Sequence, residues 1–175
     1  MKNFATAVVV ALGLYAYLSA AGQPLGGDYD AAIQTLALRP QVRQALELAR
    51  DLEAGAEATL IELTETPAPP FGEADRAQKF AALLREVVLR DVTVDAVGNV
   101  VARRPGRGRG ETIAIVAHLD TVFPFETDVT VRRRGDRLYA PGIADDTRGL
   151  VLLLNVARAL DRAGVSTVAD ILFVG

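Results

Sequence analysis

The first half of the chain carries two amphipathic segments that predict helices. Residues 41–65 are rich in Ala, Leu, Glu and Arg and place their apolar side chains at helical spacing, with Gly55 expected to interrupt them. Residues 73–90 predict a second helix. Its apolar face consists of Phe80, Leu83, Leu84 and Val87. The proline-rich stretch 67–72 between the two predicts a rigid loop, because proline fixes φ and removes a backbone donor.

From residue 91 the pattern changes to the period of β-strands. Residues 91–97 alternate apolar and polar positions, Gly98-Asn99 supplies a turn, and residues 100–103 predict the returning strand. The apolar run 111–117 predicts a buried central strand. Residues 129–139 predict a hairpin that turns near a Gly-Asp pair.

The last part of the chain predicts one helix and one strand. Apolar residues recur at helical spacing over residues 146–163, and Gly164 suits the C-terminal end of that helix. Residues 168–175 predict the final strand. Strands that alternate with helices indicate an α/β architecture, in which helices cover a largely parallel or mixed sheet.

The N-terminus has the layout of a signal peptide. Lys2 precedes an apolar stretch over residues 4–18, which is followed by the small residues Ser19-Ala20-Ala21 and then by a helix-breaking Gly-Gln-Pro. The apolar stretch is short for a membrane span, which needs roughly 20 residues. We therefore expect a signal peptide over residues 1–21, then a linker and short helix over residues 22–40. The alternative is an uncleaved leader that anchors the protein in a membrane.

Composition narrows the chemistry. The chain has no cysteine, which excludes disulfides, thiolate metal sites and a cysteine nucleophile. The net charge of −3 gives no electrostatic reason to expect a nucleic-acid partner. The 175 residues, half of them apolar, can form one domain with a sizeable core, or the first part of something larger.

The single histidine of the chain, His118, directly follows the predicted strand 111–117, and Asp120 comes two residues later. Residues i and i+2 of a strand point to the same face, so the carboxylate of Asp120 can reach the imidazole. A carboxylate on one ring nitrogen fixes the tautomer and leaves the other nitrogen free to bind a metal. The alternative is a core histidine paired with a nearby acid.

A second acidic pair, Asp145 and Asp146, follows a Pro-Gly turn at the start of the last predicted helix. One aspartate suits the N-terminal cap of a helix, and two in succession suggest a second role such as metal binding. The spacing from His118 to Asp145 leaves room for the hairpin and a return to the same edge of the sheet.

Four motifs follow one another within residues 59–175: Leu63–Gly72 (LTETPAPPFG), Asp95–Val100 (DAVGNV), Ala117–Val122 (AHLDTV) and Gly142–Asp146 (GIADD). In this order they resemble the zinc-dependent hydrolases of peptidase family M20, which include aminoacylase, acetylornithine deacetylase, glutamate carboxypeptidase and tripeptide aminopeptidase. The resemblance implies the fold of a zinc-peptidase catalytic domain, a three-layer sandwich of a mixed sheet flanked by helices. Residues 41–175 would form its N-terminal part.

The resemblance also implies a role for each acidic residue and for the histidine. His118 would ligate zinc, and Asp145 would bridge two zinc ions. Asp120 would be the catalytic residue that orients His118, and Asp146 would cap the helix beside the site. In this family the peptide bond after the bridging aspartate is often cis. The implied reaction is hydrolysis of a peptide or amide bond in a small peptide or N-acyl amino acid, and the full-length protein would form a homodimer.

The chain departs from the family pattern at its end. The family continues past a strand like Ile171–Gly175 into two glutamates, a general base and a ligand, followed by a further acidic ligand, a second histidine and a lid domain. The sequence contains none of these, so we expect part of a catalytic domain that is inactive by itself. The alternatives are a non-catalytic α/β binding or structural domain and a catalytically dead, membrane-anchored relative.

Export can be tested directly. Cleavage of the leader is expected to leave a mature N-terminus near Gly22. N-terminal sequencing of the protein recovered from outside the cytoplasm checks this expectation, and an intact Met1 on soluble cytoplasmic protein contradicts it.

Overall fold

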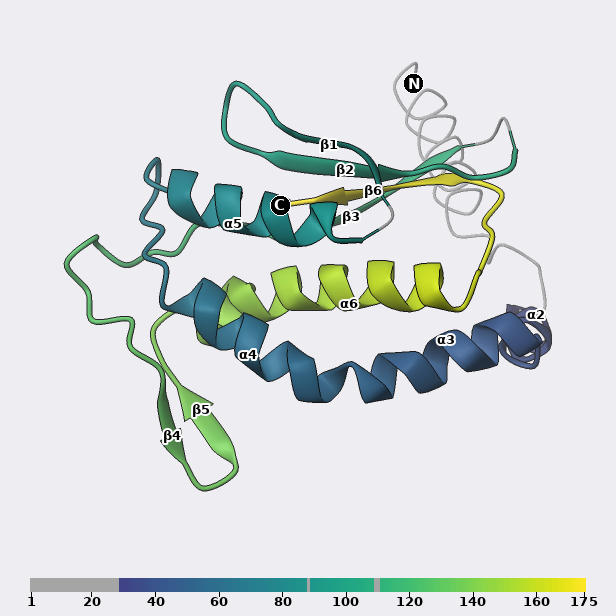
Figure 1. Ribbon diagram of the computed structural model, residues 1–175, viewed down its shortest axis with the longest axis horizontal. Coiled ribbons are helices and arrows are strands. Elements are labelled where there is room, and N and C mark those ends of the chain that lie inside the picture. Colours follow the sequence, from purple (N-terminus) through teal and green to yellow (C-terminus); the bar gives the residue numbers. More distant parts are fainter. Residues whose placement is uncertain (1–28, 88, 109–110) are drawn as a thin grey trace, which may run out of the picture. The chain divides into compact units, whose positions relative to one another are not determined.

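A computed structural model describes residues 29–87, 89–108 and 111–175 (Figure 1). The predicted signal peptide, residues 1–21, and the start of the predicted linker lie outside the described residues. The chain divides after residue 37 into two compact units. Helix α2 (Tyr29–Ala37) belongs to the first unit. Within the described part of the chain, no helix is both long enough and apolar enough to span a membrane.

The second unit contains both helices and strands. Its helices are α3 (Pro40–Asp51), α4 (Glu53–Thr64), α5 (Ala74–Arg85) and α6 (Arg148–Arg162), the last preceded by a π-helical turn, η1 (Ile143–Thr147). Its strands are β1 (Arg90–Val94), β2 (Val100–Arg104), β3 (Thr112–Val116), β4 (Arg132–Arg134), β5 (Arg137–Tyr139) and β6 (Asp170–Val174).

The main sheet is mixed. Its strands lie in the order β1-β2-β6-β3, with β2 antiparallel to both β1 and β6, and β3 parallel to β6. Strands β4 and β5 form a separate hairpin, whose turn contains Gly135 at φ 62°. Because β3 and β6 are parallel, their carboxyl ends lie together, and the Ala117 N–H donates to the Val174 carbonyl over 3.0 Å. The segment that follows β3 therefore begins at this edge of the sheet.

One core joins the sheet to the helices. Phe80 of α5, Leu150 of α6 and Phe173 of β6 are completely buried in it. Figure 1 shows α6 with the sheet on one side and the pair α3 and α4 on the other. The predicted α/β class, a mixed sheet flanked by helices, is confirmed.

Helix α6 owes its place to an apolar stripe. Its buried side chains recur at intervals of three and four residues, which places them on one face of a helix. They include Leu150, Leu153, Leu154 and Ala157, with Val151 buried beside them. Leu152 falls outside the stripe and is 61% exposed. The helix ends where predicted, with Gly164 at φ 60°.

The predicted break in the first helical segment is three residues out of place. The chain is interrupted at Leu52, between α3 and α4, whereas Gly55 lies inside α4. The Leu52 carbonyl accepts hydrogen bonds from both the Gly55 and the Ala56 N–H, at 3.1 and 2.9 Å, which tightens the backbone before the glycine. The second predicted helix also ends early, at Arg85, and the buried Val87 joins the core from the turn that follows.

The sequence predicts a central, buried strand over residues 111–117. In the described part of the chain, this strand is neither central nor buried. Strand β3 stands last in the order of the sheet, and β6 takes the position between it and β2. Ile113 is 53% exposed and Val116 is 66% exposed. An apolar run predicts a strand that can be buried on both faces, but the neighbours that bury it are decided elsewhere in the chain.

Two leucines of α6 allow a matched test of this packing. Leu154→Ala is expected to lower the free energy of unfolding by about 2–5 kcal/mol, because it leaves a cavity in the core. Leu152→Ala, the control on the exposed face of the same helix, is expected to change it by less than about 0.5 kcal/mol. Urea denaturation measures both, and equal losses would contradict the assigned stripe.

Candidate functional site

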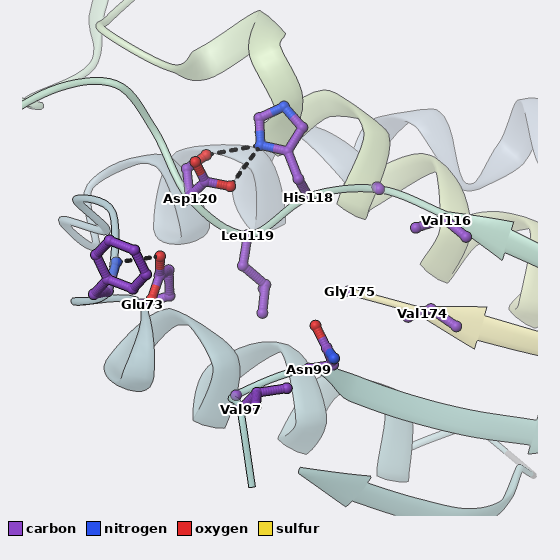
Figure 2. A pocket seen from close by; sticks show the side chains of 12 residues that line it. Glu73, Val97, Asn99, Val116, His118, Leu119, Asp120, Val174 and Gly175 are labelled. Carbon is purple, nitrogen blue, oxygen red and sulfur yellow. Dashed lines mark hydrogen bonds and ion pairs between the residues drawn. The ribbon is translucent and has the colours of Figure 1, made fainter. Parts of the chain in front are cut away.

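The imidazole of His118 is held by the residue two positions along the chain. Its Nδ1 lies 2.9 Å from the carbonyl oxygen of Asp120 and 3.2 Å from the carboxylate Oδ1 of the same residue (Figure 2). A carbonyl oxygen only accepts hydrogen bonds, so Nδ1 is the donor. In the neutral ring this leaves Nε2 with a free lone pair. The carboxylate reaches the ring as predicted, although both residues lie beyond Val116, the last residue of β3, and the backbone carbonyl adds a contact that the sequence did not indicate.

The other ring nitrogen faces Asp145. His118 Nε2 lies 2.9 Å from Asp145 Oδ1, although the two residues are 27 positions apart. The fold thus brings the first and second acidic motifs together around one imidazole. The His118 side chain is 49% exposed and that of Asp145 is 90% exposed, so both are accessible to solvent.

Asp146 joins the start of α6 to the end of β3. Its Oδ1 accepts a hydrogen bond from the Gly149 N–H over 3.1 Å, as a helix cap does, and its Oδ2 accepts one from the His118 N–H over 3.3 Å. A Cβ on Gly149 would lie 2.2 Å from Asp146 Oδ1, so this close approach requires glycine. The peptide bond between Asp145 and Asp146 is cis, as the family resemblance predicts.

The turn before the acidic pair is equally tight. Gly142 has φ 74°, and its carbonyl accepts a 2.8 Å hydrogen bond from the Thr147 hydroxyl. A Cβ on Gly142 would lie 2.6 Å from Thr121 Cγ2, in the segment just after His118. Glycine therefore permits both the left-handed backbone and the contact between the two halves of the site.

A pocket of about 430 Å³ lies beside His118 and Asp120. Figure 2 shows Leu119 extending into it from the segment after β3. Its lining is mainly apolar, with a few polar groups: Phe71, Glu73, Val97–Asn99, Val116–Asp120, Val174 and Gly175. A volume of this size suits a small-molecule ligand.

The surrounding carboxylates raise the pKa of His118 above its ordinary value of about 6.5. The largest cause is the hydrogen bond to Asp145, which favours the imidazolium, and partial burial opposes it. The Asp120 carbonyl and the charges of Asp120 and Asp146 act in the same direction as Asp145.

Two hydrogen bonds that hold the segment after β3 in place were not predicted from the sequence. The buried Thr121 donates its N–H to the Ala68 carbonyl over 2.7 Å, which ties the proline-rich loop to the site. The completely buried Arg76 donates to the Leu119 carbonyl over 2.9 Å. A signal for Arg76 exists in the sequence, because it occupies the same helical face as the buried Ala77, Phe80 and Leu84.

The donor atoms fit zinc in kind but not in number. Zinc takes imidazole nitrogen and carboxylate oxygen, which His118 Nε2 and Asp145 Oδ1 offer. A complete site needs three or four protein ligands. Within residues 29–87, 89–108 and 111–175, no group of three or more His, Cys, Asp or Glu side chains could hold a metal ion.

Comparison with known proteins finds similarity to peptidases over part of the chain. The model of peptidase family M28 matches residues 99–175. Carboxypeptidase G2 of Pseudomonas sp. (strain RS-16) is 36% identical over 69 residues, which are 38% of this chain and 16% of the relative. The chain thus spans about a sixth of the length of this curated relative.

Solved structures share the fold. The di-peptidase Dug1p of Saccharomyces cerevisiae superposes with a TM-score of 0.64 at 13% identity, over 78% of this chain and 34% of that one. The YXEP protein of Bacillus subtilis is described as a dinuclear metal binding peptidase from the M20 family. It gives a TM-score of 0.52 at 20% identity, over 71% of this chain and 35% of that one. The expected resemblance to the N-terminal portion of M20 peptidases is confirmed.

The effect of Asp145 on the imidazole can be measured in the metal-free chain. Asp145→Asn is expected to lower the pKa of His118 towards its ordinary value, because the charged acceptor is lost. An NMR titration follows it cleanly, since the chain has one histidine. Asp136→Asn, in the exposed hairpin turn, is the control and is expected to leave the pKa unchanged.

The same pKa sets a pH dependence of stability. A raised folded-state pKa contributes stability that is fully present below the unfolded value of about 6.5 and is lost as the pH rises through the folded value. Urea denaturation at a series of pH values from below 6.5 upwards measures this dependence. As the pH rises, the free energy of unfolding is expected to fall less in Asp145→Asn than in the wild type. An identical pH profile for the two proteins contradicts the assigned contact.

Proposed function

We propose that the chain forms the N-terminal part of the catalytic domain of a metal-dependent peptidase or amidohydrolase. One observation carries the proposal. The Nδ1 of His118 is occupied by Asp120, while its Nε2 faces the carboxylate of Asp145. A metal-ligating imidazole donates its other ring N–H to a carboxylate or carbonyl, as His118 Nδ1 does, and Asp145 sets a second candidate ligand beside Nε2.

Each residue of the group has a task in this proposal. His118 and Asp145 hold the metal, and zinc is the ion that suits their nitrogen and oxygen atoms, with two ions in the complete enzyme. When bound, zinc supplies Lewis-acid activation of water and of the amide carbonyl. Asp120 fixes the tautomer and orientation of His118. Asp146 holds the His118 backbone against the first turn of α6.

The substrate and the location are part of the proposal. The peptidase names of the relatives and the pocket of about 430 Å³ beside His118 support a small peptide or an N-acyl amino acid as the substrate. The leader over residues 1–21 supports export from the cytoplasm. The resemblance to M20 peptidases is the support for a homodimer of the full-length protein.

The competing function is a binding or structural α/β domain without catalysis. One observation favours it. The described residues supply two candidate metal ligands, whereas a zinc site needs three or four. The catalytic proposal needs further ligands from polypeptide outside these residues. A Glu-Glu pair and a later histidine encoded downstream of Gly175 would support catalysis, and their absence would support the alternative.

Metal content and turnover of the whole gene product test the proposed roles. His118→Ala is expected to remove one zinc ion and most of the activity, because it deletes a metal ligand. Asp120→Ala is expected to weaken zinc affinity or rate by roughly 10- to 100-fold, as loss of an orienting group does. Residues 22–175 alone are expected to bind zinc weakly and to hydrolyse no peptide.

The control is Asp136→Ala in the exposed turn of the β4–β5 hairpin, which is expected to keep full zinc content and turnover. Two tightly bound zinc ions and full turnover in His118→Ala would refute the assignment of the metal site. A larger loss of zinc in Asp120→Ala than in His118→Ala would reverse the roles of the two residues.

A further inference from the structure

Arg76 is the largest side chain that the fold buries completely. A buried guanidinium is costly unless its donors are satisfied, and a carboxylate is the usual partner. Among the described residues, no carboxylate lies within ion-pair distance of Arg76. Its donors instead reach backbone carbonyls. Nε and Nη2 donate to the Thr66 carbonyl at 3.0 and 2.7 Å, Nη2 also reaches the Thr64 carbonyl at 3.4 Å, and Nη1 donates to the Leu119 carbonyl at 2.9 Å.

These acceptors belong to two separate parts of the chain. Thr64 and Thr66 lie at the C-terminal end of α4, where helix carbonyls have no partner within the helix. Leu119 lies 43 positions after Arg76, between His118 and Asp120. The same guanidinium therefore joins a helix end to the peptide unit at the centre of the proposed metal site.

We propose that Arg76 is a positioning residue for the metal site, acting through the Leu119 carbonyl to fix the backbone that carries His118 and Asp120. The proposal rests on the proposed function. The geometry supports it, because the residue after Leu119 is Asp120, whose carbonyl accepts a hydrogen bond from His118 Nδ1. The Leu119 carbonyl belongs to the peptide unit that directly precedes Asp120, so a change in the backbone angles there would shift Asp120 and the carbonyl that faces the imidazole. The proline-rich loop holds the far side of the segment through the Thr121 N–H.

The planar guanidinium suits this task better than another cation would. It presents several N–H groups in a fixed fork, so one side chain can hold carbonyls on both sides at defined angles. Burial lowers the pKa of Arg76, and the charge of Asp120 acts in the opposite direction. Arginine remains protonated in proteins, so all of its donors stay available. Lysine keeps the charge but lacks the fork.

The chain offers a matched control in Arg104. This partly buried arginine also donates to backbone carbonyls, that of Leu160 in the last turn of α6 and that of Val165 in the connection between α6 and β6. Loss of either arginine removes a charge and takes a donor away from buried or partly buried backbone carbonyls, so both losses destabilise the fold. Only Arg76 contacts the segment that holds His118.

The test compares Arg76→Met, Arg76→Lys and Arg104→Met in the 175-residue chain without metal. The readout is the pair of imidazole ¹⁵N resonances, which are unambiguous because His118 is the single histidine. Arg76→Met is expected to move both resonances and to remove the preference for a proton on Nδ1. Arg76→Lys is expected to give an intermediate shift, and Arg104→Met is expected to leave the resonances at their wild-type positions. Circular dichroism confirms that each variant is folded.

Unchanged imidazole resonances in folded Arg76→Met overturn the proposal, as do equal shifts in Arg104→Met. If Arg76→Met does not fold, Arg76→Lys decides the matter through the same resonances, and wild-type positions there overturn it. A zinc titration of the same variants is expected to show affinity about tenfold weaker in Arg76→Met or Arg76→Lys than in Arg104→Met. A whole gene product without zinc or turnover contradicts the proposed function, while the metal-free imidazole signals of the chain still report on Arg76.

Discussion

The parallel pairing of β3 with β6 is the interaction on which the rest of the site depends. It sets Val116 opposite Val174 and so brings the carboxyl ends of the two strands to one edge of the sheet. His118 follows directly from that edge. Helix α6 precedes β6 in the chain and packs on the same core, so the turn η1 that leads into it places Asp146 against the His118 backbone. Asp120 reaches the imidazole from two residues away in sequence, whereas Asp145 and Asp146 reach it through this arrangement of the sheet and α6.

Beyond the edge of the sheet, hydrogen bonds to backbone carbonyls replace the regular ladder. Arg76 holds the carbonyl of Leu119, and the N–H of Thr121 donates to the Ala68 carbonyl. Each contact joins the segment after β3 to a part of the chain that precedes the sheet in sequence. A segment without regular structure is thus given a defined conformation by partners from outside it, which is the condition for placing functional side chains accurately.

Negative charge is concentrated around the imidazole of His118. Three aspartates, Asp120, Asp145 and Asp146, surround one imidazole, and together they raise its pKa. The raised pKa favours the imidazolium, whose positive charge opposes that of the carboxylates. A divalent cation held by His118 and Asp145 would also offset this charge, and its binding would compete with protonation because a ligating imidazole must be neutral.

The sequence by itself determined the local elements and the local pairing of residues. The stripe of leucines defined α6, the alternation of valines defined β1 and β2, and the spacing of His118 and Asp120 predicted their contact, because periods of 3.6 and 2 are properties of short segments. The order of the strands, the exposure of β3, the contact of Asp145 with His118 and the burial of Arg76 were decided only by the tertiary structure. Each of these depends on which segments, far apart in the chain, lie side by side, and a local pattern of apolar and polar residues does not specify its neighbours.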